Sequence, residues 1–332
     1  MLYHITQQER SAGGHPSTVF TLTSPERGSH AEVWVGNGFN CLTWVNRGEH
    51  LLHRAAEWEE NPVPTRSGHP ILFPFPNRIA QGRTQWAGKS IELPKNDSTK
   101  QNAIHGSAPR VAWDTTEFQA EAEFSSVKGT FRLQQHAPDL AVKWPGDGEL
   151  QLEYILQPDC LQVNATVANR STEEEFPFGL GYHPYFRLPH GTADDWQLQM
   201  RASSYWPLVD SIPTGEVLPC PSELDFSNVR PLKDLQLDHV LTGIQPLAKD
   251  EEFSLIAVLQ SQEQAGKLEI WVTSHFRELV LFIPPHRQAV CIEPYTCTTN
   301  AINLHARGID AGWQSLPPGG QVEMKVRYRW VN

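Results

Sequence analysis

The sequence predicts an all-β fold, a sandwich or a barrel, on three observations. The segment "QVEMKVRYRW" alternates strictly between apolar and charged side chains from Val322 to Trp330, as expected for a half-buried strand. No long window shows the apolar spacing of an amphipathic helix. Gly, Pro, Asn and Asp separate many short strand-like segments, which is typical of antiparallel sandwiches and barrels.

Further strands are predicted in pairs. "LQLEYIL" and "CLQVNATVAN" flank the turn "QPD", and "AEVWV" and "CLTWV" flank "GNGFN". "TQWAGKSIELP" predicts a hairpin that turns at Ala87 and Gly88. "KLEIWVTS" and "ELVLFIP" predict one more pair, joined around "HFR". We therefore expect a sheet architecture in which strands that follow each other in sequence pair side by side.

The domain organisation is predicted to be simple. No Pro- or Gly-rich linker, internal repeat or low-complexity tract divides the 332 residues, so residues 1–332 are predicted to form a single domain. The proline-rich segments "NPVPTRSGHPILFPFP" and "LPCPSELDFSNVRPL" are interpreted as long ordered loops. Long loops on a rigid sheet are common places for binding sites.

Composition limits the class of partner. The formal net charge of −11 argues against a nucleic acid or an anionic membrane, because both attract positive charge. The first residues, "MLYHITQQERSAGG", lack the pattern of a signal peptide, and no apolar run has the length of a membrane span. The five cysteines have no CxxC spacing and are interpreted as reduced thiols of a cytoplasmic protein. Monomer and homodimer are both compatible with the sequence.

Polar residues in apolar or proline-rich loops are the candidates for chemistry. The loop segments that carry them are "FPFPNRIAQGR" with Arg78, "NAIHGSAPR" with His105 and Arg110, "GLGYHPYF" with His183, "LQLDHVLTG" with Asp238, and "CIEPYT" with Glu293. A carboxylate between apolar neighbours, as at Glu293, is costly unless it is paired or used.

Motifs for cofactors and metals are not found. The sequence has no P-loop, HExxH, GxSxG or complete GxGxxG. "HLLH" offers His50 and His53 without a third ligand, so no metal site is predicted there.

Six segments of the sequence occur in the same order as the motifs of a known family. "PNRIAQGR", "NAIHG", "HPYFRL", "IPTGEVLP", "LDH" and "EPYT" make the chain resemble the aldose 1-epimerases, or galactose mutarotases, from about Asn37 onward. The resemblance implies a single-domain, galactose mutarotase-like β-supersandwich of twisted antiparallel sheets, with the site in a cleft. Matched by motif, Glu293 is the general base and His183 the general acid. The residues matched to binding of the sugar hydroxyls are Arg78, His105 and Asp238.

The reaction implied by the resemblance interconverts the α and β anomers of a free hexose by acid/base ring opening and closure. A carboxylate is ionised at neutral pH, and an imidazole can release and regain a proton there. Because no electron or group is transferred, we expect a small-molecule sugar as the ligand and neither a cofactor nor a metal.

Three alternatives stay open at this point. A hexose-6-phosphate 1-epimerase would use Arg110 for the phosphate. A glycoside hydrolase would use Glu293 and Asp238 as its carboxylate pair. A non-catalytic sugar-binding or regulatory protein would keep the cleft without turnover, although it would not need both proton-transfer residues.

Overall fold

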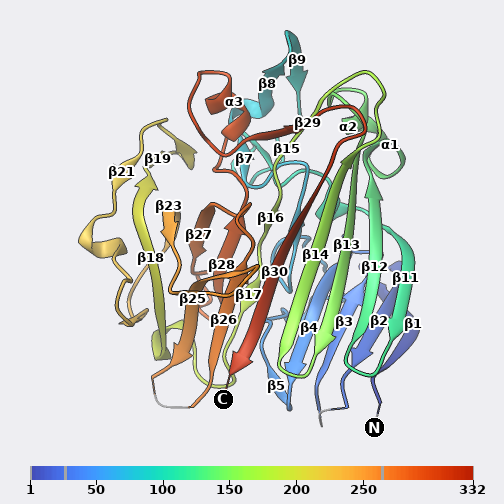
Figure 1. Ribbon diagram of the computed structural model, residues 1–332, viewed down its shortest axis with the longest axis vertical. Coiled ribbons are helices and arrows are strands. Elements are labelled where there is room, and N and C mark those ends of the chain that lie inside the picture. Colours follow the sequence, from blue (N-terminus) through green and yellow to red (C-terminus); the bar gives the residue numbers. More distant parts are fainter. Residues whose placement is uncertain (1, 26–27, 263–264, 332) are drawn as a thin grey trace.

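The computed structural model describes residues 2–25, 28–262 and 265–331, and its secondary structure is almost entirely β (Figure 1). The α-helices in these residues are single short turns: α1 (Leu133–His136), α2 (Pro138–Ala141) and α3 (Ala301–His305). The all-β prediction is therefore confirmed. None of the helices in the described ranges has the length and apolar character needed to cross a membrane.

The N-terminal strands form a separate antiparallel sheet in which each strand pairs with the next along the chain. Its strands are β1 (His4–Ala12), β2 (His15–Thr23), β3 (His30–Trp34), β4 (Asn40–Asn46) and β5 (Glu49–His50). The predicted pairing of the strands around "GNGFN" is confirmed as β3 and β4.

A longer antiparallel arm runs across the middle of the molecule, where β30 crosses diagonally in Figure 1. From one edge to the other its strands are β11 (Asp114–Ala120), β12 (Ser125–Arg132), β13 (Gly148–Gln157), β14 (Cys160–Asn169), β30 (Gln321–Val331), β26 (Lys267–Val272), β25 (Ser254–Ser261) and the first half of β18 (Trp196–Trp206). The predicted hairpin of β13 and β14 is confirmed, and the apolar face of β30 is buried as its alternation predicts.

A second arm, called the cleft arm here, begins where β18 changes partner. Met200 of β18 pairs with β25, whereas Arg201 and the residues after it pair with β23. The other strands of the cleft arm are β23 (Asp238–Gln245), β27 (Glu278–Phe282), β28 (Val290–Tyr295), β16 (Gly181–Tyr182), β17 (Tyr185–Phe186) and β6 (Ile71–Leu72).

Short strands complete the loops. They are β7 (Arg78–Ile79), β8 (Arg83–Trp86), β9 (Lys89–Glu92), β10 (Ala103–Ile104), β15 (Phe176–Phe178), β19 (Leu208–Val209), β20 (Ile212–Pro213), β21 (Leu218–Pro219), β22 (Arg230–Pro231), β24 (Ala248–Lys249) and β29 (Gln314–Leu316). The hairpin predicted at Ala87 and Gly88 joins β8 to β9, and both turn residues have positive φ (47° and 78°). Two successive residues with positive φ form a turn whose twist matches that of the strands it connects.

One predicted pairing is wrong. "KLEIWVTS" and "ELVLFIP" do form strands, β26 and β27, but these strands belong to different arms. β26 pairs with β25 and β30, while β27 pairs with β23 and β28. The connection around His275 and Phe276 therefore carries the chain from one arm to the other. A hairpin and such a crossing have the same local sequence signals, because both need two strands and a short loop.

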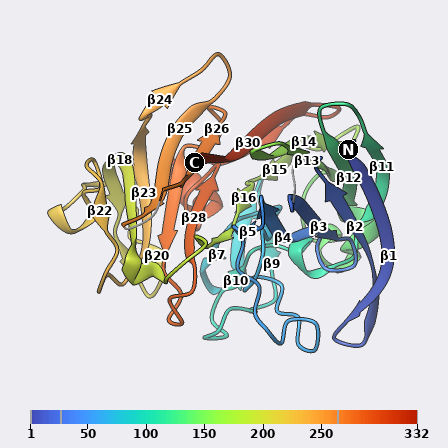
Figure 2. The same cartoon turned by 90° about the horizontal axis from the view of Figure 1, so that it is seen from below.

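The N-terminal sheet and the strands β11–β14 face each other as two layers, seen from the end in Figure 2. Their apolar faces share one large core cluster that extends from Phe20 to Trp330 and includes Val33, Val127 and Leu150. Phe20 contacts Phe118 across the layers, with ring centroids 5.2 Å apart. This packing fixes the sheets rigidly enough to hold loops at their edges in place.

Candidate active site

His183 occupies an interruption in the cleft arm. β16 and β17 both pair with β28, through Gly181 with Tyr295 and through Tyr185 with Cys291. His183 lies between these two short strands, and its backbone N–H donates to the carbonyl of Pro70 at 3.0 Å. Pro184 has no N–H to donate to a ladder, so the strand breaks there. The imidazole of His183 lies beside the middle of β28, where it faces Glu293.

The imidazole meets a carboxylate at this point. Nε2 of His183 lies 3.4 Å from Oε1 of Glu293, and the two residues are only 8% and 1% exposed. The His183 ring stacks on Tyr185, with centroids 4.8 Å apart, and stands edge-on to His105 at 5.7 Å. Its Nδ1 is buried and has no hydrogen-bond partner among the described residues. The pair is thus firmly placed but incompletely satisfied.

The second oxygen of Glu293 has a different partner. The hydroxyl of Tyr295 donates to Oε2 at 2.6 Å. Sequence reasoning assigned no role to Tyr295. The available signal was its spacing, because side chains two apart on a strand lie on the same face.

Burial shifts the pKa values of the pair in opposite directions. Desolvation raises the pKa of Glu293 well above its usual range, and the hydrogen bond from Tyr295 opposes that rise. Desolvation lowers the pKa of His183 to about 4. Both shifts favour the uncharged forms, as expected when titratable groups leave water. Since the 3.4 Å contact couples the two groups, their protons are best described for the pair as a unit.

Arg78 and His105 are brought together by the short pair β7 and β10, in which Arg78 is opposite Ile104. The backbone N–H of Asn77 donates to Nδ1 of His105 at 3.2 Å. Burial holds the pKa of His105 well below its usual value, so the ring is neutral and its proton is on Nε2. His105 thus offers an N–H donor.

The guanidinium of Arg78 is held by its neighbours. Its Nη1 donates to Oδ1 of Asn77 at 3.1 Å, and its Nε lies 3.6 Å from Oδ2 of Asp97. Burial opposes ionisation of Asp97, but hydrogen bonds from Asn102 and Thr99 outweigh it and lower the pKa of Asp97 to about 2. The Asp97 carboxylate beside Arg78 is therefore ionised at neutral pH.

Asp238 begins β23 and completes the set. It pairs with Phe282, which pairs with Cys291, so Asp238 is on the sheet face that also carries Glu293. The residue keeps solvent-accessible surface, yet packed atoms around its carboxyl raise the pKa and the charge of Arg78 opposes that rise. Asp238 and Arg78 both act electrostatically on Glu293. The five residues matched to the site by motif thus lie in one region.

Cys291 is a further neighbour that the sequence did not single out. The donor atoms of His183, Cys291 and Glu293 all lie within 4.8 Å of one another, a grouping that could ligate a metal ion. Burial raises the pKa of the Cys291 thiol well above its usual value. Metal binding would require loss of that proton and would occupy both members of the His–Glu pair.

A cavity of about 550 Å³ is lined by residues on either side of His105 in the sequence, among them Ile104 and Gly106. Gly106, Ser107 and Arg110 form one side of it, and Lys143 lies on its lining. Most of the remaining lining is apolar, with Phe75 among the residues. In the described part of the chain, no carboxylate forms an ion pair with Arg110.

Comparisons with known proteins identify the family and the fold of this chain. The family model for aldose 1-epimerase matches residues 42–329. YihR, an uncharacterized protein of Escherichia coli K12, is 27% identical over 286 residues, 84% of this chain and 83% of YihR.

Solved structures show the same fold. A galactose mutarotase-like protein of Clostridium acetobutylicum superposes with a TM-score of 0.84 at 19% identity, covering 100% of this chain and 99% of its own. A galactose 1-epimerase of Lactobacillus acidophilus superposes with a TM-score of 0.78 at 19% identity, with the same coverages. The galactose mutarotase-like β-supersandwich is therefore confirmed, and the chain belongs to the aldose 1-epimerase family.

Proposed function

We propose that this protein is an aldose 1-epimerase that interconverts the α and β anomers of a free hexose. The observation that carries the proposal is the buried contact of 3.4 Å between Nε2 of His183 and Oε1 of Glu293, beside Arg78, His105 and Asp238. One proton acceptor and one proton donor, both within reach of the anomeric centre, are what mutarotation requires.

The proposed reaction moves protons without changing their number on the pair. The Glu293 carboxylate takes the proton of the C1 hydroxyl while the His183 imidazolium gives its proton to the ring oxygen. The C1–O ring bond breaks, its electrons pass to the ring oxygen, and the open aldehyde forms. After rotation about C1–C2, the aldehyde presents its other face, and both transfers reverse on closure.

The pKa shifts suit such reversibility. Before ring opening the pair is carboxylate and imidazolium, and afterwards it is carboxylic acid and neutral imidazole. Burial favours the uncharged arrangement. The close contact favours the charged one, because opposite charges attract strongly where water is scarce. Two opposing contributions keep both arrangements accessible, which a reaction running in both directions needs.

The three remaining residues supply the complementary bonding groups. Arg78 and the Nε2–H of His105 are donors, and the Asp238 carboxylate is an acceptor. Each hydroxyl of a hexose can donate or accept a hydrogen bond, so these groups would fix the orientation of the sugar over the His183–Glu293 pair. Correct orientation of the reacting atoms is itself a large part of a catalytic rate.

Polarimetry of freshly dissolved α-galactose and α-glucose tests the proposal. The wild-type protein is expected to speed the approach to anomeric equilibrium, with the Glu293→Gln variant as the inactive control. Absence of acceleration for a panel of free aldoses that bind in thermal-shift assays would contradict the proposal and favour a sugar-binding protein.

A phosphorylated hexose is the second candidate substrate. The observation that favours it is Arg110, on the lining of the adjacent cavity without a paired carboxylate in the described chain. A coupled assay on glucose 6-phosphate separates the two candidates. Acceleration confined to the phosphosugar, and lost in Arg110→Gln, would select the phosphorylated substrate.

A further inference from the structure

We propose that Tyr295 is a positioning residue that divides the two oxygens of Glu293 between separate tasks and so presents one of them for proton transfer. Its hydroxyl holds Oε2, which leaves Oε1 as the oxygen that exchanges protons beside His183. This inference rests on the proposed function, because it specifies how the same site works.

The geometry supports the division directly. The distance from the Tyr295 hydroxyl to Oε2 is 2.6 Å, and the distance from His183 Nε2 to Oε1 is 3.4 Å. Each oxygen therefore has one neighbour and the two neighbours approach from different elements, β28 itself and the break between β16 and β17. A carboxylate held at one oxygen cannot turn its second oxygen away from the reaction.

The fold leaves a specific space for the tyrosine ring. Gly181 pairs with Tyr295, and a Cβ at Gly181 would lie only 2.5 Å from Cδ1 of the ring. Glycine is thus needed for the ring to lie across β16. Tyr295 has no exposed surface, so water does not compete for its hydroxyl. Burial and the neighbouring Glu293 raise the pKa of Tyr295 well above its usual range, so that it remains a donor.

The other groups around Glu293 do not replace this hydrogen bond. Those that face it are His183, Tyr185, Cys291, Asp238 and Arg78. The charge of Asp238 opposes ionisation of Glu293, and the charge of Arg78 favours it. Arg78 is already bonded to Asn77 and lies beside Asp97. The Tyr295 hydroxyl is therefore the main local group that offsets the burial of Glu293.

A second buried tyrosine, in β16, serves as the matched control. Tyr182 is also fully buried, but its hydroxyl has no hydrogen-bond partner among the described residues. Its ring packs against His69 and Phe276. Tyr182→Phe and Tyr295→Phe thus remove the same atom from two buried rings, and only the second removal affects Glu293.

The test is a titration of the Glu293 carboxyl by infrared spectroscopy, with its carbonyl band identified by its loss in Glu293→Gln. In Tyr295→Phe the midpoint is expected to move to higher pH by about one to two units, the size of a lost hydrogen bond to a charged group. The limb of the kcat–pH profile that reflects ionisation of Glu293 is expected to move to higher pH as well. Tyr182→Phe leaves both unchanged.

A second variant keeps the test decisive if Tyr295→Phe folds poorly. 3-Fluorotyrosine at position 295 has a more acidic hydroxyl and donates more strongly, so the Glu293 midpoint should move to lower pH. An unchanged midpoint in both variants, or equal shifts in the Tyr182 and Tyr295 variants, would overturn the role of Tyr295. The infrared titration needs no turnover, so failure of the proposed activity would show separately, as a wild-type protein without mutarotase activity.

Discussion

Two buried histidines in this molecule are satisfied to very different degrees. His69 lies in the core between the layers, and both ring nitrogens are bonded, Nδ1 to the Tyr154 hydroxyl at 3.0 Å and Nε2 to the Tyr328 hydroxyl at 2.8 Å. His183 lies in the cleft arm, where its Nδ1 has no hydrogen-bond partner among the described residues and its Nε2 faces a carboxylate. Burial lowers the pKa of both rings, to about 3 and about 4.

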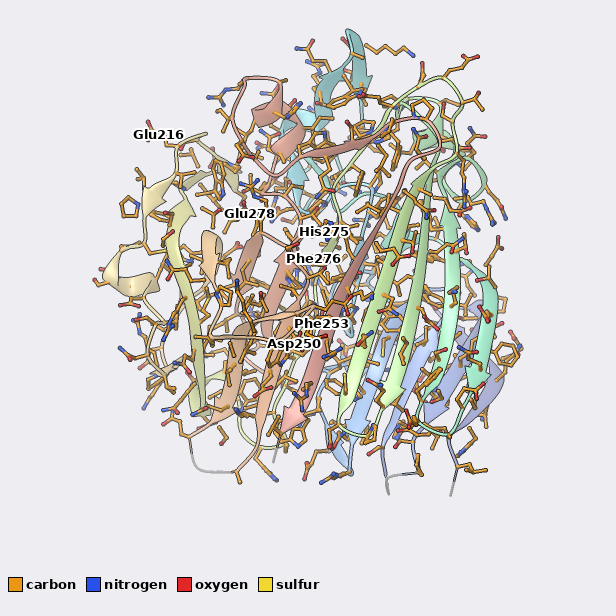
Figure 3. The ribbon with its side chains drawn as sticks, in the orientation of Figure 1. Glu216, Asp250, Phe253, His275, Phe276 and Glu278 are labelled. Atoms are coloured by element: carbon orange, nitrogen blue, oxygen red, sulfur yellow. The ribbon has the colours of Figure 1, made fainter. Side chains whose placement is uncertain are left out.

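The buried carboxylates of β27 and β28 differ in the same way. Glu278, labelled near the upper end of β27 in Figure 3, accepts hydrogen bonds at both oxygens, from Trp206 at 3.0 Å and from Thr242 at 3.1 Å. Glu293 accepts a hydrogen bond from Tyr295 at Oε2, and its Oε1 faces His183. Both are almost fully buried.

The comparison teaches that burial and a shifted pKa do not by themselves identify a catalytic group. His69 and Glu278 have both, and their polar atoms are used up by structural partners. His183 and Glu293 face each other, and Nδ1 of His183 has no hydrogen-bond partner among the described residues. Unused capacity in a firmly placed group is the feature that suits proton transfer.

The largest expected difference is between the two glutamates. Glu293→Gln should lower kcat by roughly 10²- to 10⁴-fold, the usual share of general acid–base catalysis. Glu278→Gln should keep kcat within about threefold, because its oxygens serve Trp206 and Thr242. Initial rates by polarimetry at one saturating sugar concentration measure both. Equal losses in the two variants would remove the distinction.

The histidines should differ in stability. His69→Phe leaves the Tyr328 hydroxyl buried without its partner and leaves the Tyr154 hydroxyl with only the backbone carbonyl of position 69, at 3.4 Å, which should cost about 2–5 kcal/mol of unfolding free energy. His183→Asn should change it by less than about 1 kcal/mol while lowering kcat strongly. Urea unfolding monitored by tryptophan fluorescence gives both values. A His183 variant as unstable as the His69 variant would argue for a structural role.

The titration of Glu278 should appear in the pH dependence of the unfolding free energy. Burial raises its pKa from 4.5 to about 7, so the folded state binds more protons than the unfolded state between these values. Below about pH 4.5 the raised pKa contributes roughly 3 kcal/mol to the unfolding free energy. This contribution is lost as the pH rises to about 7. Glu278→Gln should abolish this part of the pH dependence. The check is to measure the unfolding free energies of the wild-type and Glu278→Gln proteins at pH 5 and pH 8. A difference between the two pH values that is equal in both proteins would contradict the prediction.

The smallest expected effect is at Asp238, the most exposed residue of the candidate site. Asp238 keeps contact with solvent, so Asp238→Asn should lower kcat/KM by about tenfold, mainly through KM, as one hydrogen bond to the sugar is weakened. Initial rates across a range of sugar concentrations separate the two constants. A loss confined to kcat would instead place Asp238 in the proton transfers.

Local sequence patterns predicted most strands but not all of their partners. The alternation of β30 and the turn between β13 and β14 are local signals, and the structure confirms both predictions. The connection between β26 and β27 crosses between arms because of packing far from it in sequence. The gathering of Arg78, His105, His183, Asp238 and Glu293 was expected only from the family resemblance. The bond from Tyr295 to Glu293 depends on ring placement over Gly181, which no motif specified.

The most direct test of the account is the exchange between the anomeric protons of glucose or galactose at equilibrium, followed by two-dimensional NMR exchange spectroscopy. The account predicts exchange cross-peaks with the wild-type protein, loss of them with Glu293→Gln and with His183→Asn, and retention of them with Glu278→Gln. Undiminished exchange in the Glu293 and His183 variants, with both folded, would contradict the claim that this pair carries out the proton transfers.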